Sequence, residues 1–331
     1  MRLLPWPPTR MGDGPAAAAA AVTIGAKSAN SPSNLHRQML LVNRYDAASP
    51  LPRPFELQPT GLSRTAQVTR RRGERDVWSR DSEAALNLPE VVTREEWLVA
   101  RKQLLGREKE LTRQRDQVNA DRRRLPMVAI EKSYTFEGPD GPAGLADMFD
   151  GCSQLIVRHA MFDPEWAAAC PSCTAGMDET APALLAHLRT RDTSYAVVSR
   201  APYPKLAEYR TDHGWTFPWY SSFGSDFNYD FAVTLDPAIT PVVYNYRNHD
   251  ELIALDPAWA DDSSGEVGGF SCFLHAGDTV FHTYSTYGRG GEAVDLAIYA
   301  HLDITALGRQ EDWEEPKGRV AEPRVAGPVF S

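Results

Sequence analysis

The sequence predicts an α/β protein, a sandwich with a central mixed sheet, preceded by one long amphipathic helix. Three observations lead to this fold class. Short apolar, β-branched runs alternate with helical segments from Tyr134 to Leu302, the pattern of strands packed against helices. Two of these runs flank the turn Ala276-Gly277-Asp278 and therefore predict a hairpin. Before them, apolar residues recur at every seventh position, which indicates a helix.

Residues 1–87 are expected to form a disordered basic extension. The region is rich in Pro, Ala, Ser and Arg, with an alanine tract at 16–21 and the cluster Arg70-Arg71-Arg72. It lacks sustained periodicity, so it offers little apolar surface to offset the entropy cost of folding. An Arg-rich, acid-poor start also resembles an organellar transit peptide, and a start codon assigned too far upstream is a further explanation. A second disordered segment is expected at 313–331.

Residues 88–126 predict the long amphipathic helix. Thr93, followed three residues later by Glu96, is a capping-box signature, and Pro126 ends the segment. The apolar stripe consists of residues seven apart: Trp97, Leu104, Leu111, Val118 and Leu125. Such a stripe also suits a coiled-coil dimer, but the second core position is charged, at Arg101, Glu108 and Arg115. We therefore expect the helix to pack on its own domain.

Residues 127–312 are expected to form the α/β domain. The expected strands are 134–136, 154–159, 195–199, 270–274 and 280–284. The expected helices are 145–149, 204–213 with Gly214 as its cap, and 293–302. A further helix is opened by Cys170. Gly176 and Pro182 divide it, and Pro182 starts its second part, 182–188.

Composition and charge argue against several classes of partner. Of the 331 residues, 42% are hydrophobic and 10% aromatic, as in soluble globular proteins. No apolar stretch reaches the roughly 20 residues that a membrane helix needs, so no membrane is expected as a partner. A net charge of −9 argues against general nucleic-acid binding. Four cysteines without a secretory signal predict a reducing, cytoplasmic location.

The candidate catalytic residues are Cys170 and Cys173, in the tetrad Cys170-Pro171-Ser172-Cys173. The tetrad follows an apolar strand and opens a helix, with Pro171 in the first turn, where a missing N–H costs nothing. The free N–H groups of the helix would stabilise a thiolate at Cys170, so its pKa is expected below the free value of about 8.5. Cys173 lies one turn further on, and is expected to be more buried and to act as the resolving thiol.

The same pair of cysteines has other interpretations. It could be structural or vestigial, or half of a metal site. Zinc needs two further ligands, and the remaining cysteines, Cys152 and Cys272, are isolated. A Cu(I) site formed by the pair and His282 is a third alternative. The redox interpretation requires no metal and no cofactor.

The order strand, dithiol, helix, strand, helix, hairpin, helix resembles the thioredoxin superfamily. Eight segments carry a closer likeness: 161–164, 170–173, 198–202, 214–222, 225–230, 244–247, 281–290 and 302–309. Over roughly residues 88–312 they resemble the thioredoxin-like family catalogued as domain of unknown function 899. The resemblance implies a thioredoxin-like fold and no established activity. The redox role of the wider superfamily carries over only to Cys170 and Cys173.

The resemblance also implies a substrate groove beside the dithiol. The superfamily places a proline, usually cis, before the first hairpin strand. Pro218 matches in chain order, Pro202 is the rival candidate, and Trp166 and Trp219 are expected to flank the groove. Ala169 replaces the aromatic residue normally adjacent to the first cysteine, which puts a fast, general disulfide reductase in doubt.

The sequence therefore favours a thiol–disulfide oxidoreductase or thiol-dependent reductase, with a protein or small-molecule disulfide as substrate. A peroxidase is the weaker variant, because Ala167 stands where peroxiredoxins carry Thr or Ser. The alternative is a non-catalytic adaptor that binds a partner through the long helix and an aromatic surface. The aromatic-rich blocks suit either a well-filled core or a pocket: Trp215, Phe217, Trp219, Tyr220, Phe227, Tyr229, Tyr244 and Tyr246.

Overall fold

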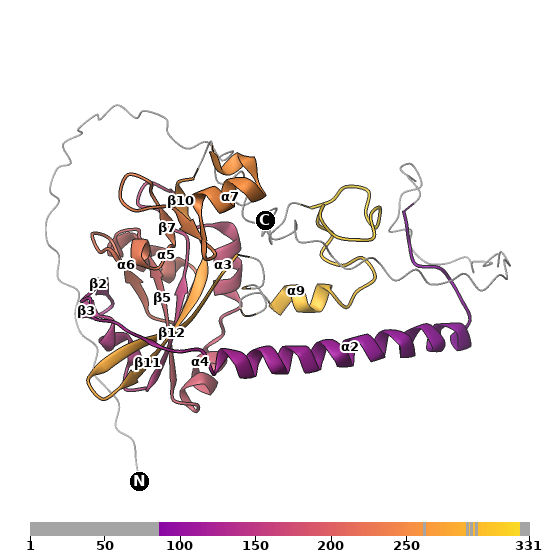
Figure 1. Cartoon of the computed structure of the whole chain (residues 1–331), viewed down its shortest axis with the longest axis horizontal. Coiled ribbons are helices and arrows are strands. Elements are labelled where there is room, and N and C mark those ends of the chain that lie inside the picture. The colour runs from indigo at the N-terminus through magenta and orange to yellow at the C-terminus, as the bar shows by residue number, and fades with distance from the viewer. Residues whose placement is uncertain (1–85, 261–262, 289–290, 292–293, 295–296, 325–331) are drawn as a thin grey trace, which may run out of the picture.

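A computed structural model describes residues 86–324, apart from 261–262, 289–290, 292–293 and 295–296 (Figure 1). The extension expected to be disordered therefore lies outside the described residues, except for its last two. Among the described residues, no helix is both long and apolar enough to cross a bilayer.

An eight-stranded mixed sheet forms the centre of the protein, in the order β1-β12-β11-β4-β5-β6-β2-β3 (Figure 1). The strands are β1 (Val128–Ala129), β2 (Thr135–Gly138), β3 (Gly141–Gly144), β4 (Gln154–His159), β5 (Thr193–Ser199), β6 (Trp219–Ser221), β11 (Gly269–Ala276) and β12 (Thr279–Tyr287). Strands β4, β5 and β6 are parallel, whereas β11 and β12 form an antiparallel hairpin that joins β4. The expected mixed sheet and hairpin are confirmed.

Helices and two small sheets surround this centre. The helical segments are α2 (Arg94–Arg122), η2 (Ala146–Phe149), α3 (Pro171–Asp178), α4 (Pro182–Arg189), α5 (Tyr203–Asp212), α6 (Phe227–Asp230), α7 (His249–Leu255), η3 (Pro257–Ala260) and α9 (Ala297–Leu302). The small sheets pair β7 (Thr234–Leu235) with β10 (Gly265–Glu266), and β8 (Val243–Tyr244) with β9 (Arg247–Asn248). The chain order β4, α3, β5, α5, hairpin is that of a thioredoxin-like fold.

The central sheet has a hydrophobic core on each face. Alternate residues of β5 enter different cores, because successive side chains of a strand point to opposite faces. Ala196 and Val198 pack in one core with Phe136, whereas Val197 packs in the other with Cys170 and Cys173. The dithiol therefore lies on the face opposite to the larger aromatic core.

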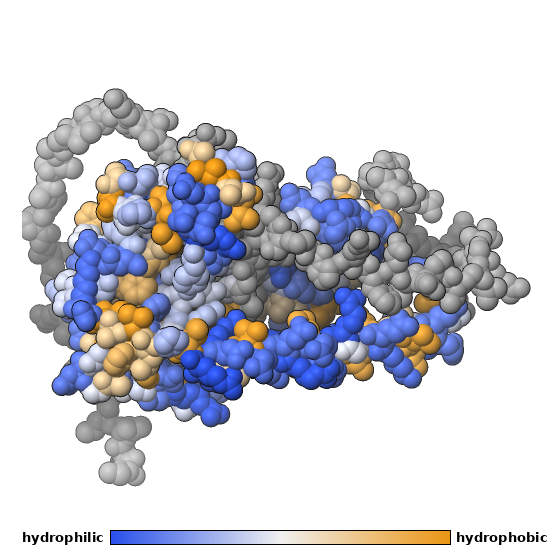
Figure 2. Space-filling model, in the orientation of Figure 1, coloured by the Kyte–Doolittle hydropathy of each residue, from blue (hydrophilic) through white to orange (hydrophobic). Residues whose placement is uncertain are grey.

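Helix α2 begins as expected but packs differently. Thr93 and Glu96 form the capping box, and the helix ends before Pro126, with Arg123 as its C-cap. None of its residues is buried, and Trp97 is 45% exposed. The helix extends away from the sheet, with isolated apolar side chains on a hydrophilic rod (Figures 1 and 2). The expectation that it packs on its own domain is wrong, because a narrow stripe, widened only by Leu98 and Leu105, offers little area to bury.

The end of the chain also differs from expectation. Part of the segment expected to be disordered, 313–324, is described and makes backbone hydrogen bonds. Asn87 donates from its backbone N–H to the Gly318 carbonyl at 2.7 Å, and Arg324 donates to Gln310 at the same distance. The first of these contacts joins the start of the described chain to its end. Residues 325–331 lie outside the described part.

Candidate functional site

The cysteine pair lies where the sequence predicts it, at the carboxyl end of β4. A ten-residue connection, 160–169, leads from β4 to α3. Cys170 is the N-cap of α3 and Pro171 occupies its first turn. This proline fits because the first turn has no intrahelical use for its missing N–H. Both cysteines are free thiols in the structure.

Burial and protonation of the two thiols differ from the expectation. Cys170 is 0% exposed and Cys173 is 6% exposed, so Cys170 is not the more accessible thiol. A hydrogen bond with the Cys173 sulfur, together with burial, raises the pKa of Cys170 well above its usual range. Backbone hydrogen bonds with Cys173 and Ser172 act in the opposite direction and are outweighed. The expected low pKa of Cys170 is therefore wrong.

Cys173 has polar contacts of its own. The backbone N–H of Met161 donates to the Cys173 sulfur at 3.4 Å. The buried guanidinium of Arg158 donates to the Cys173 carbonyl oxygen at 2.9 Å and lies over the Phe270 ring. An N–H donor stabilises negative charge on a sulfur. Both sulfurs therefore have backbone donors, and the raised pKa of Cys170 keeps the proton on that thiol.

Two of the three expected groove residues belong to, or pack against, the hydrophobic cluster that contains the dithiol. Trp219 is buried in the same cluster as the cysteines, and its indole N–H donates to the Ser199 hydroxyl at 3.0 Å. Trp166 is partly buried and packs against that cluster.

Pro218 does not face the dithiol. It lines a depression of about 690 Å³ together with Thr193 and Ser194, which begin β5 at the opposite end of the sheet. Neither Pro218 nor Pro202 follows a cis peptide bond. The residue before the hairpin is Gly268, where an added Cβ would lie 3.8 Å from the Cys173 sulfur. Pro218 instead precedes β6, a strand that the sequence analysis did not expect.

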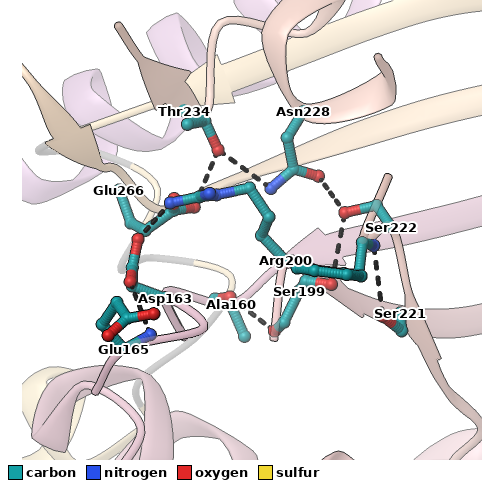
Figure 3. Close-up of polar contacts among 11 residues, drawn as sticks. Ala160, Asp163, Glu165, Ser199, Arg200, Ser221, Ser222, Asn228, Thr234 and Glu266 are labelled. Atoms are coloured by element: carbon teal, nitrogen blue, oxygen red, sulfur yellow. Dashed lines mark hydrogen bonds and ion pairs between the residues drawn. The ribbon is translucent and has the colours of Figure 1, made fainter. Parts of the chain in front are cut away.

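A polar network that the sequence analysis missed adjoins the connection before α3 (Figure 3). Arg200 follows β5 and forms ion pairs with Asp163 and, at 2.6 Å, with Glu266. Burial raises the pKa of Glu266, and Arg200 opposes that shift. The network continues through hydrogen bonds between hydroxyl and amide groups. The Thr234 hydroxyl donates to Glu266, and the Asn228 amide donates to the Thr234 hydroxyl. The Ser222 hydroxyl contacts the Asn228 side-chain oxygen and the Ser199 carbonyl. The available signal was polar residues after two parallel strands, whose carboxyl ends share one sheet edge.

Two histidines, His159 buried and His282 partly buried, are linked by a second chain of polar contacts. His159 Nε2 contacts the Ser271 hydroxyl at 2.8 Å, Ser271 contacts Ser285 at 2.7 Å, and Ser285 contacts His282 Nε2 at 2.7 Å. Burial lowers the pKa of His159 to about 3, and His282 adds to that shift. The Nδ1 atom of His159 is buried without a hydrogen-bond partner.

This arrangement corrects the Cu(I) alternative. His282 packs against Phe231 and Phe273 of the larger aromatic core, not against Cys170 or Cys173. In the described part of the chain, no three His, Cys, Asp or Glu side chains are grouped to hold a metal ion. The alternative therefore lacks its third ligand.

The aromatic-rich blocks are largely core. Phe217, Trp219, Phe227 and Tyr244 are almost completely buried. Tyr246 is exposed, although its hydroxyl donates to the Ser285 carbonyl at 2.7 Å. The core interpretation holds for the buried members, and they build no open aromatic pocket.

Comparisons with known proteins identify a family and several distant structures. A family model described as "Bacterial protein of unknown function (DUF899)" matches residues 86–323. No curated protein matches the chain. A mutant of peroxiredoxin Q from Xanthomonas campestris is similar at 16% identity and TM-score 0.32, over 54% of this chain and 96% of that one. A mutant of PrxQ from Xylella fastidiosa is similar at 13% identity and TM-score 0.30, over 51% of this chain and 89% of that one. A putative protein disulfide isomerase from Bacteroides thetaiotaomicron is similar at 13% identity and TM-score 0.29, over 51% of this chain and 85% of that one.

Proposed function

The chain belongs to the DUF899 family of bacterial proteins, and we propose that its thioredoxin-like domain is a thiol–disulfide oxidoreductase that uses Cys170 and Cys173. The observation that carries this proposal is the interaction of the two thiols, since Cys170 is hydrogen-bonded to the Cys173 sulfur at the start of α3. A protonated thiol beside a sulfur with its own N–H donor is the reduced state of a reversible dithiol.

We assign the attacking role to Cys173, because Cys173 keeps some exposure whereas Cys170 has none, and because the pKa of Cys170 is raised. Its thiolate attacks one sulfur of a substrate disulfide, forms a mixed disulfide and expels the first product thiol. Cys170 then loses its proton and attacks the Cys173 sulfur, which expels the second product thiol. Two electrons pass from the dithiol to the substrate, and the two thiol protons end on the products. The roles are the reverse of those that the sequence predicts, because Cys170 is the more buried thiol and its pKa is raised.

A redox titration tests this function. The protein is equilibrated in glutathione or dithiothreitol buffers, and the Cys170–Cys173 disulfide is quantified by mass spectrometry. We expect a reversible transition with a midpoint between about −180 and −270 mV. Cys152→Ser is the control that keeps the transition, whereas Cys173→Ser loses it. A pair that stays reduced up to about −120 mV contradicts the proposal.

A non-catalytic adaptor is the second candidate, and helix α2 favours it. Its 29 residues include no buried one, and Leu111 is 66% exposed. A helix with an unburied apolar stripe suits a partner that covers it. In an adaptor the cysteines are incidental. The same titration decides between the candidates, because an adaptor needs no reversible disulfide.

A further inference from the structure

Residues 160–169, which we call the cover segment, enclose both sulfurs. Phe162 is fully buried in the cluster that contains Cys170 and Cys173. Met161 accepts a hydrogen bond from the Cys170 backbone N–H at 3.0 Å and donates its own N–H to the Cys173 sulfur. A molecule larger than a few atoms therefore reaches either sulfur only when the cover segment moves.

Lys205 of α5 holds the cover segment from the side. Its ammonium group donates to the backbone carbonyls of Pro164, at 3.0 Å, and Trp166. The same ammonium lies 4.8 Å from the centre of the Phe162 ring. Hydrogen bonds from a charged donor are stronger than neutral ones, and a cation over a ring adds to them. Lys205 thus makes three contacts with one short segment.

Asp163 provides a second attachment. It pairs with Arg200, and both side chains are largely shielded from solvent (Figure 3). Arg200 is itself fixed by the buried carboxylate of Glu266 at 2.6 Å. The Asp163 side chain also accepts the backbone N–H of Glu165, which fixes the turn within the segment. The cover segment is therefore attached to α5 and to the end of β5 through charged side chains.

We propose that Lys205 determines which disulfides react with the dithiol: by keeping the cover segment closed, it excludes bulky disulfides from Cys173 and admits compact low-molecular-weight ones. The inference rests on the proposed function of the pair. Cys173 is the thiol that retains some exposure, so it is the one that a compact molecule reaches first.

Two maleimides of different size test the proposal. N-ethylmaleimide and fluorescein-5-maleimide share one reactive group, and peptide mass spectrometry separates labelling of Cys173 from that of Cys152 and Cys272. In Lys205→Met we expect labelling by the fluorescein reagent to accelerate about tenfold, because charged hydrogen bonds that close the segment are lost. N-ethylmaleimide labelling should accelerate by less than about threefold, since it needs less opening.

Matched variants make the result specific. Lys205→Arg keeps charged donors and should restore the size selectivity. Lys102→Met, on the exposed surface of α2, should leave both rates unchanged. An unchanged ratio of the two rates in Lys205→Met, or an equal rise in both, overturns the proposal.

A second variant guards against misfolding of the first. Asp163→Asn weakens the other attachment and should change the ratio in the same direction. Hydrogen exchange should accelerate in residues 161–170 while the amides of β4 and β5 stay protected. Equal loss of protection in the strands means global opening and also overturns the proposal. Alkylation by a maleimide needs a free thiol but no reversible disulfide. The labelling rates therefore test the role of Lys205 even if the redox titration fails.

Discussion

His159 should make the protein acid-sensitive between pH 7 and pH 5. Its side chain lies in an aromatic environment, with ring centroids 5.7 Å from Phe227 and 6.0 Å from Phe231. Burial lowers its pKa to about 3, from 6.5 for the unperturbed group. In the unfolded chain the His159 imidazole therefore binds a proton near pH 6.5, whereas in the folded protein it stays neutral at that pH. The free energy of unfolding must fall as the pH drops below about 6.5, and must continue to fall until about pH 3.

The magnitude follows from this interval. The interval from the unperturbed pKa of 6.5 to pH 5 spans 1.5 pH units. At about 1.36 kcal/mol per unit, His159 alone lowers the free energy of unfolding by about 2 kcal/mol over this interval. His159→Gln removes the titration, and its amide nitrogen can replace Nε2 as the partner of Ser271. Urea denaturation at both pH values measures the difference between wild type and variant. If both proteins lose the same free energy of unfolding, the burial argument for His159 is refuted.

Two further predictions concern packing. Leu111→Ala should change the free energy of unfolding by less than about 1 kcal/mol, because Leu111 is 66% exposed and no residue of α2 is buried; a larger loss in urea denaturation would mean that the helix is covered in solution. Gly269→Ala should destabilise by about 1–3 kcal/mol, since its Cβ would lie 2.7 Å from the Thr286 carbonyl oxygen, whereas Gly268→Ala meets only ordinary contacts and should cost less; equal costs would contradict the close approach of β11 to β12.

The sequence predicted the elements better than their environments. β4 has the predicted bounds, and the hairpin and the start of α3 at Cys170 follow from local signals: apolar runs, a Gly-Asp turn and Pro171. The burial of Cys170 depends on residues 160–169 folding over it, which is a tertiary event without a periodic pattern. A helix N-terminus alone therefore gave the wrong direction for its pKa.

Long-range partners were the other limit. Arg200 meets Asp163 and Glu266, which are 37 and 66 residues away, so no spacing rule links them. Pro218 was chosen by chain order, but the strand that follows it is β6, and the hairpin begins only at Gly269. The seven-residue stripe of α2 predicted the helix correctly, but the stripe alone cannot say what covers it.

Trapping of a mixed disulfide tests the central claim most directly. Cys170→Ser and Cys173→Ser are each incubated with glutathione disulfide at neutral pH, and glutathionylated peptides are quantified by mass spectrometry. The account predicts a stable adduct on Cys173 in Cys170→Ser, because the attacking thiol remains and the resolving thiol is gone. It predicts little adduct on Cys170 in Cys173→Ser, because that thiol is fully buried. Adduct on Cys170 alone, or on neither cysteine, would contradict the claim that Cys173 is the attacking thiol of a reversible dithiol.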